Sequence, residues 1–369
     1  MVERPYRSWV EISKARIAAN YSAVQAVVGP AVEVMGVVKA DAYGHGAVEV
    51  SRVLVAAGAR WLAVSSVEEG IALRRAGIEA RILVMGGYFS DELGALDEHA
   101  LTPVVHDLAD LPTLRERAVR FHLKIDSGMN RMGTPASAGG IAAALLLPGT
   151  QCEGLMTHFS SAADYSSLQT ERQIEHFSAV CAALLQIGPL PRYLHLSSTN
   201  AIAYGRREAW QNMVRPGHAI YGYVSPAKGG SPARVLDVKP ALEWKTKIAL
   251  IKEVPEGMPI GYGGTFRAPR LMRIGVLSVG YADGFPHRLS NKGKVIAAGR
   301  FAPVVGTVSM DLTTVDLTNA PSLKAGDTVT LLGREGDTSL DAQQIAKLAG
   351  TISYSVLCGI GARVKRVYV

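Results

Sequence analysis

Short apolar runs rich in β-branched residues alternate with longer stretches in which apolar residues recur at helical spacing. Val34, Val37 and Val38, for example, have the character of a strand buried on both faces. The repeating unit is therefore a strand followed by a helix, as in parallel α/β sheets. The predicted strands lie at 34–40, 61–64, 81–85, 101–105, 121–125, 153–157, 193–196 and 212–214, and the predicted helices include 47–57, 67–76, 108–119 and 168–186.

Eight such units predict an N-terminal (β/α)8 barrel of the TIM type. Active sites of these barrels lie at the C-terminal ends of the strands, and phosphate favours the loops after strands seven and eight. Unusual polar residues follow the predicted strands at these ends: Lys39 after the first, Lys124, Asp126 and Arg131 after the fifth, His158 after the sixth, Ser197 to Thr199 after the seventh, and Arg215 to His218 after the eighth.

Lys39 is the most informative of these residues, because an apolar strand delivers it into a glycine-rich turn. A dry strand end would lower the pKa of its amine and favour a Schiff base with a carbonyl compound. Tyr43 and the backbones of Gly44 and Gly46 follow at once and suit an anionic group. The alternative is a lysine that extends from the strand end into water.

The last third of the chain has a different pattern. The segment 225–232 has the composition of a linker, which places the domain boundary near residue 235. The prediction is a barrel domain at 1–235, whose first strand at 9–12 could pack with the second domain, and a mainly β domain at 236–369. Extended segments are expected at 241–254, 272–281, 295–317 and 328–332, with a lone helix at 339–348 closed by Gly350.

Composition limits the classes of function. Hydrophobic residues make up 48% of the chain and charged residues 19%, which is typical of a globular enzyme. The net charge of +7 is not clustered as nucleic-acid binding would require, and an anionic ligand accounts for it equally well. Three cysteines without metal-site spacing, and no signal peptide or membrane-length apolar run, predict a cytoplasmic protein that binds no metal and no membrane.

Ordered motifs along the whole chain resemble the bacterial alanine racemases, barrel enzymes that use pyridoxal 5'-phosphate (PLP). Each motif is weak alone, whereas the ordered set is specific. The motifs are Val38-Lys-Ala-Asp-Ala-Tyr-Gly-His-Gly46, Lys124-Ile-Asp-Ser-Gly-Met-Asn-Arg-Met-Gly133, Met156-Thr-His-Phe159, Val214-Arg-Pro-Gly217, Tyr262-Gly263, Gly280-Tyr-Ala-Asp-Gly284, Ser309-Met-Asp311 and Ile352-Ser-Tyr354.

The resemblance implies that Lys39 forms a Schiff base with PLP and that Arg215 faces the pyridine nitrogen. A guanidinium cannot protonate that nitrogen, which favours rapid return of the proton over transamination. Racemisation needs two bases on opposite faces of the α-carbon. By resemblance these are Lys39 and Tyr262, with His158 and Arg215 supporting the phenol, although Tyr262 alone is equally typical of a turn.

Further roles are implied by the resemblance. Arg131 approaches the substrate carboxylate, and Lys124 matches a position that is carbamylated in some relatives, where the new carboxylate orients that arginine. From the residues alone, Arg131 could instead pair with Asp126. The implied cofactor ligands are His158, Arg215 and Lys39, together with the phosphate ligands Tyr43, Thr199, Gly217, His218 and Tyr354.

Tyr281 and Met310 resemble residues at the substrate entrance and carboxylate, and in the family they come, with Tyr262, from the other subunit. This implies a homodimer with shared active sites. Without the resemblance, Met310 would be interpreted as core filling. Ser309 and Phe266 differ from the cysteine and tyrosine that are frequent in the family.

The implied activity is the interconversion of L-alanine and D-alanine, either to supply D-alanine for peptidoglycan or to serve alanine catabolism. Two other classes of PLP-binding protein share part of this pattern. A PLP-binding homeostasis protein shares the barrel and lysine but lacks the β domain. A barrel-type amino-acid decarboxylase has two domains, but an acidic partner for the pyridine nitrogen is expected there, where this chain has Arg215.

Overall fold

The computed structural model describes residues 6–369, and the chain divides into two compact units. The barrel unit consists of Arg16–Ala42 and Ala47–Lys239. The β unit consists of the residues up to Ala15, Tyr43–Gly46 and Pro240–Val369. The β unit therefore includes two short segments from the N-terminal part of the chain.

Eight parallel strands form one sheet in the described part of the barrel unit. The two end strands meet through a parallel bridge between Ser198 and Arg215, where the Arg215 backbone N–H donates to the Ser197 carbonyl at 2.9 Å. The barrel is thus nearly closed. In sheet order the strands are β8 (Tyr193–His195), β7 (Cys152–Met156), β6 (Phe121–Lys124), β5 (Leu101–Val105), β4 (Arg81–Val84), β3 (Trp61–Val64), β2 (Glu33–Val37) and β9 (Met213–Val214).

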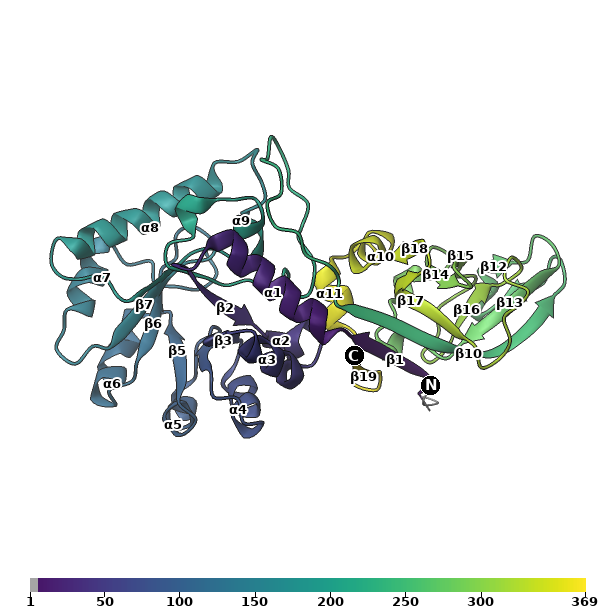
Figure 1. Cartoon of the computed structure of the whole chain (residues 1–369), viewed down its shortest axis with the longest axis horizontal. Helices are drawn as coiled ribbons and strands as arrows, with labels where there is room; N and C mark the ends of the chain where they lie inside the picture. The colour runs from purple at the N-terminus through teal and green to yellow at the C-terminus, as the bar shows by residue number, and fades with distance from the viewer. Residues whose placement is uncertain (1–5) are drawn as a thin grey trace. The chain divides into compact units, whose positions relative to one another are not determined.

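Helices follow the strands and cover the outer side of this sheet, as α4, α5 and α6 show in Figure 1. The predicted continuous helix at 108–119 is wrong, because Leu108–Asp110 is a 3-10 turn and α6 begins only at Leu111. The helices are α1 (Lys14–Val28), α3 (Ala47–Ala56), α4 (Val67–Arg75), α5 (Leu93–Glu98), α6 (Leu111–Glu116), α7 (Ala138–Leu145), α8 (Gln169–Leu185) and α9 (Thr199–Ala203), with 3-10 turns at Ser90–Glu92 and Arg207–Ala209.

The segment α2 (Lys39–Tyr43) is a left-handed turn that the sequence did not predict. Ala40, Asp41, Ala42 and Tyr43 have φ values of 53°, 49°, 53° and 53°. Left-handed backbone brings Cβ close to the following carbonyl oxygen, so each such residue costs roughly 1–2 kcal/mol. Strain of this kind is found mainly at functional sites, and here it follows Lys39 directly.

The β unit is built on an antiparallel sheet with one parallel pair at its edge. The long strand β10 pairs with β1, β13 and β17, so the first strand of the chain belongs to this unit. The strands are β1 (Ser8–Ile12), β10 (Leu242–Val254), β13 (Met272–Leu277), β14 (Lys294–Ala297), β15 (Arg300–Pro303), β16 (Thr313–Asp316), β17 (Thr328–Glu335), β18 (Thr338–Leu340) and β19 (Lys365–Tyr368), plus the separate pair β11 (Pro259–Ile260) and β12 (Phe266–Arg267).

Two helices rather than the predicted lone helix lie in the described part of the β unit. The helix α10 (Ala342–Ala349) begins after Asp341, whose side chain accepts from the Gln344 N–H at 2.8 Å. Gly350 ends it in the left-handed conformation at φ 63°. The second helix is α11 (Ser353–Cys358), and 3-10 turns occur at Tyr262–Gly264, Tyr281–Asp283 and His287–Leu289.

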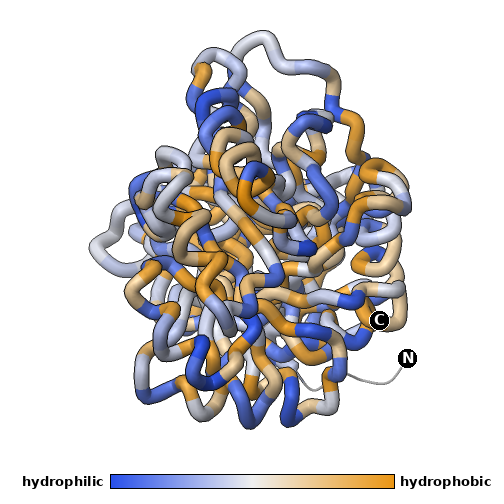
Figure 2. The backbone as a smooth tube through the Cα atoms, turned by 90° about the vertical axis from the view of Figure 1, so that its left-hand side faces the viewer, coloured by the Kyte–Doolittle hydropathy of each residue, from blue (hydrophilic) through white to orange (hydrophobic). Residues whose placement is uncertain are grey.

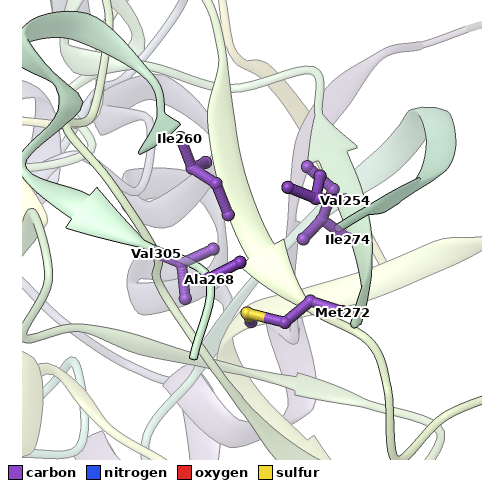
Figure 3. Close-up of a cluster of buried hydrophobic side chains, with 6 residues drawn as sticks. All are labelled: Val254, Ile260, Ala268, Met272, Ile274 and Val305. Carbon is purple, nitrogen blue, oxygen red and sulfur yellow. The ribbon is translucent and has the colours of Figure 1, made fainter. Parts of the chain in front are cut away.

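Apolar side chains fill the interior of each unit. Along the tube of Figure 2, hydrophobic and hydrophilic residues alternate as expected where an element buries one face. One apolar cluster lies under the β11–β12 hairpin, and Figure 3 shows its side chains converging. Its members are Val254, Ile260, Ala268, Met272, Ile274 and Val305.

The predicted fold class is confirmed: a (β/α)8 barrel followed by a mainly β domain. Among residues 6–369, every helix is too short or too polar to cross a lipid bilayer.

Candidate active site

Lys39 lies just beyond the barrel strand β2, at the end predicted for an active site. The strand β2 ends at Val37, and Val38 still donates to the Ala63 carbonyl at 2.8 Å. Lys39 is therefore two residues past the strand rather than its last residue, and its side chain is half-buried. The Ala40 N–H donates to Glu69 at 2.7 Å, which fixes the start of the left-handed turn.

Positive charge accumulates around Lys124 at the end of β6. The side chain is 6% exposed. Burial lowers its pKa to about 8, assisted by the nearby charges of Arg131, Arg215 and Lys39, while Asp126 acts in the opposite direction. These groups from three strand ends therefore share one electrostatic neighbourhood, as their positions in the sequence predict. Four cations with one carboxylate form a site that suits an anionic ligand.

The carboxylate of Asp126 organises the loop that carries Arg131. Its Oδ1 accepts backbone N–H groups from Gly128, Met129 and Asn130 at 3.0, 3.0 and 3.1 Å. Although burial alone would raise the pKa of Asp126, these donors hold it below its usual value. Arg131 is exposed, and no ion pair joins it to Asp126 in the described part of the chain. The alternative of a simple loop ion pair is therefore wrong.

Arg215 follows β9 and is 3% exposed. Its Nη2 donates to the carbonyl of Thr157 at 2.7 Å and to that of Leu196 at 3.1 Å, and lies 3.5 Å from His158 Nδ1. Burial lowers the pKa of Arg215 to about 9, which still leaves it charged at neutral pH. Burial and then the charge of Arg215 lower the pKa of His158 to about 3, so its imidazole is neutral.

Gln173 on α8 holds the backbone around His158, a role that the sequence analysis missed. Its Nε2 donates to the His158 carbonyl at 3.0 Å and to the Ser127 hydroxyl at 3.2 Å. Its Oε1 accepts from the backbone N–H and the hydroxyl of Ser160, both at 3.1 Å. One buried amide thus ties the loops after β6 and β7 to a helix.

Thr199, Gly217 and His218 come together at the loops after β8 and β9. The Thr199 hydroxyl oxygen accepts from the backbone N–H groups of Gly217 at 3.3 Å and Ala219 at 3.1 Å. Its O–H group is then the part that can donate to a phosphate. The His218 ring stacks on Tyr223 with centroids 5.1 Å apart and an interplanar angle of 21°.

In the β unit, Tyr43 lies against Tyr354, a residue of α11. Their ring centroids are 6.0 Å apart. Burial, and then the neighbouring Tyr354 and Cys358, raise the pKa of Tyr43, so its phenol stays protonated and can donate. The turn approaches α11 and β19 closely: a Cβ on Gly44 would lie 2.3 Å from the Leu357 carbonyl oxygen. Two predicted phosphate ligands are thereby brought together.

Tyr262, Tyr281 and Met310 are exposed by 77%, 45% and 53%. Hydrogen bonds hold their loops: the Tyr281 N–H donates to the Ser309 carbonyl at 3.0 Å, and the Thr307 hydroxyl donates to the Tyr262 carbonyl at 3.0 Å. Interpretation of Met310 as core filling is therefore wrong.

Two family profiles cover nearly the whole chain. Residues 12–226 match the profile described as alanine racemase, N-terminal domain, and residues 241–368 match that described as alanine racemase, C-terminal domain. The chain belongs to the alanine racemase family.

Relatives in this family match over their full length. An alanine racemase of Halothermothrix orenii is 38% identical over 100% of this chain and 97% of its own. The structure of alanine racemase from Clostridium difficile 630 has a TM-score of 0.92 at 34% identity, covering 100% of this chain and 97% of that one. The alanine racemase from Bartonella henselae with covalently bound pyridoxal phosphate has a TM-score of 0.88 at 26% identity, covering 99% and 100%.

The racemase-family motifs do not include Arg363, which connects two loops of the β unit. Arg363 lies two residues before β19. Its Nε donates to Asp283 at 2.7 Å and its Nη2 to Asp311 at 2.6 Å. These carboxylates are next to the loops of Tyr281 and Met310, so Arg363 links both loops. Their shared Asp content, two residues after Tyr281 and one after Met310, was the available signal.

Proposed function

We propose that the chain is a PLP-dependent alanine racemase that interconverts L-alanine and D-alanine. The observation that carries the proposal is the combination of a full-length family match with a half-buried lysine, Lys39, surrounded by cations at a barrel mouth.

The residues fit PLP chemically. The cations Lys124, Arg131 and Arg215 near Lys39 leave an excess of positive charge, which an anionic cofactor or substrate would offset. When bound, PLP supplies an electron sink for negative charge at the substrate α-carbon. Lys39 would hold the cofactor covalently through Nζ, and Arg215 would face its ring nitrogen. The proposed ligands of the remaining cofactor atoms are His158, Tyr43, Thr199, Gly217, His218 and Tyr354.

Two residues would move the proton. Lys39 Nζ would remove or return the α-proton on one face of the substrate, and Tyr262 Oη would do so on the other. A phenol needs support to act as a base near neutral pH. His158 is neutral, and its Nδ1 lies 3.5 Å from Nη2 of Arg215, which is charged at neutral pH. We propose that these two residues supply that support.

Arg131 is proposed to bind the substrate carboxylate, together with Met310 and Tyr281. The lowered pKa of Lys124, about 8, gives its amine a neutral fraction near physiological pH. A neutral amine is the form that reacts with CO₂, which supports carbamylation of Lys124 as a proposal. The resulting carboxylate would add a second negative charge to the cation cluster, beside that of Asp126.

We also propose a homodimer with shared active sites. The support is the exposure of Tyr262, Tyr281 and Met310, which are large, largely apolar side chains of the kind enriched at interfaces. In this proposal the β domain, from residue 236, contributes these side chains to a second copy of the chain. Three free cysteines agree with the proposed cytoplasmic location. Supply of D-alanine for peptidoglycan or alanine catabolism is the proposed physiological role.

Incubation of the enzyme with L-alanine and PLP in deuterated water tests the proposal. Chiral chromatography should follow the approach to a racemic mixture, and mass spectrometry should find deuterium at the α-carbon. Alanine that stays L, in the presence of bound PLP, would contradict the proposed reaction.

A further inference from the structure

We propose that His195 and His122 form a hydrogen-bond relay through the barrel core that positions Arg215, with Glu153 at its far end. The inference rests on the proposed function, because it concerns how the proposed cofactor-facing guanidinium is held. His195, His122 and Glu153 are positioning residues in this account, since they act through Arg215.

The relay begins at Arg215 Nη1. This group donates to His195 Nδ1 at 2.8 Å and to the His195 carbonyl at 2.6 Å. His195 Nε2 is in turn 2.8 Å from His122 Nδ1. Both imidazoles are 0% exposed, and they come from β8 and β6. The path therefore runs inside the barrel, away from the strand ends that carry the other site residues.

The contacts fix the tautomer of both rings. A guanidinium can only donate, so His195 Nδ1 must accept and the proton of this ring must be on Nε2. His195 Nε2–H then donates to His122 Nδ1, which places the second proton on His122 Nε2. Every donor is thus oriented from Arg215 toward the interior. Burial, then the charges of Arg81 and Arg215, lower the pKa of His122 to about 3, and burial first also lowers that of His195, so both rings are neutral.

A carboxylate lies at the far end. His122 Nε2 is buried without a hydrogen bond among the described residues, and it lies 3.8 Å from Glu153 Oε1. Glu153 is held by an ion pair with Arg81, whose guanidinium lies 4.0 Å from the centre of the Trp61 ring. The His122 N–H therefore meets a fixed negative charge, which favours the Nε2–H tautomer.

The barrel provides space for the relay at Gly154. A Cβ on this residue would lie 2.5 Å from His122 Nδ1, so any larger residue would displace the ring. Barrel interiors are usually filled by branched apolar side chains, and a buried polar group is destabilising unless it is hydrogen-bonded. Two connected imidazoles beside a glycine therefore form a built feature rather than ordinary core packing.

The relay matters because Arg215 forms no ion pair within residues 6–369. Its acceptors are backbone carbonyls and imidazole nitrogens, which are neutral. If His195 changed tautomer, an N–H would face Nη1 and repel it. The charge of Glu153 prevents this change through His122, so Arg215 keeps one orientation.

Nitrogen-15 NMR of histidine-labelled, full-length holoenzyme tests the tautomers directly. The relay predicts that His122 and His195 are neutral, with the proton on Nε2 in both. His122→Phe and Gly154→Ala variants assign the signals. A proton on Nδ1 of either ring, or a charged ring at neutral pH, would overturn the relay.

Kinetics then tests its role. In His122→Phe the buried His195 N–H loses its acceptor, and kcat should fall about 10-fold with little change in KM, equivalent to about 1.4 kcal/mol. His122→Asn keeps an acceptor near Nδ1 but loses contact with Glu153. Its kcat should therefore fall less than that of His122→Phe and by about as much as that of Glu153→Gln. Thermal unfolding and PLP affinity check that each variant is folded.

The matched control is Glu33→Gln. Glu33 is also the carboxylate of an ion pair, with Arg60, and it lies on β2, but among residues 6–369 no histidine forms an ion pair or hydrogen bond with it. Its kcat should equal that of the wild type. If Glu153→Gln and His122→Asn also equal the wild type, the relay is wrong. A wild-type enzyme that fails to racemise alanine would instead refute the proposed function, while the NMR result would still report on the tautomers.

Discussion

The left-handed turn after Lys39 makes Ala40→Gly a stabilising substitution. Ala40 has φ 53° and ψ 52° and is exposed, so its methyl group contributes little packing. Left-handed backbone costs an alanine roughly 1–2 kcal/mol, and glycine avoids this cost. Glycine also gains freedom in the unfolded chain, which offsets part of the effect. The net gain in the free energy of unfolding should be about 1 kcal/mol.

The opposite result is expected for Ala179→Gly, which is the matched control. Ala179 is also exposed, but it lies inside the long helix α8. Glycine in a helix interior is about 1 kcal/mol less favourable than alanine. The same chemical change should therefore raise stability at one position and lower it at the other.

Thermal unfolding of the cofactor-free proteins, followed by circular dichroism, measures both effects. A change of about 1 kcal/mol corresponds to about 2–4 °C in the midpoint for a unit of this size. Ala40→Gly should raise the midpoint by this amount and Ala179→Gly should lower it. If Ala40→Gly lowers the midpoint as Ala179→Gly does, the turn is not strained and the argument fails. A decrease in kcat accompanying the higher midpoint would indicate that the strain helps to place Lys39.

Three further outcomes are expected. Lys39→Ala should lose covalent attachment of PLP, which absorbance after borohydride treatment would detect; retained attachment would reassign the lysine. Mixing equal amounts of Lys39→Ala and Tyr262→Phe should restore activity at about a quarter of the sites. About half of the dimers are then mixed, and a mixed dimer with shared sites contains one intact site of two. No recovery after verified subunit exchange would contradict shared sites. In CO₂-free buffer, the Lys124 contribution to the free energy of unfolding should rise between pH of about 8 and about 10.4, because the unfolded chain binds more protons than the folded chain in this range. Urea unfolding should show this rise in the wild type and not in Lys124→Met. Parallel wild-type and variant curves of stability against pH would exclude the lowered pKa.

The barrel could be predicted because its strands are short apolar runs and their order follows the chain. The helix at 108–119 could not be placed by periodicity alone, since Pro112 lacks an N–H and starts a new helix near Leu111. A capping box formed by Asp341 and Gln344 marks the start of α10, but the helix prediction relied on periodicity and did not use this signal. The turn at 40–43 had little signal, because alanine and tyrosine do not favour positive φ.

The grouping of Lys39, Lys124 and Arg215 could be predicted for the same reason, since parallel strands bring their ends to one edge. The relay through His122 and His195 could not. Both residues lie within strands, where a histidine is indistinguishable by spacing from any other buried residue. Their significance depends on a side-chain contact between β6 and β8, which joins residues 73 positions apart in the sequence.

The two-base assignment is tested most directly by Tyr262→Phe in deuterated water, starting separately from L-alanine and D-alanine. If Tyr262 and Lys39 act on opposite faces, the variant should keep bound PLP and still exchange the α-proton of one enantiomer, while exchange of the other enantiomer and racemisation should be lost. Wild-type exchange and turnover of both enantiomers would contradict the assignment of Tyr262 as the second base.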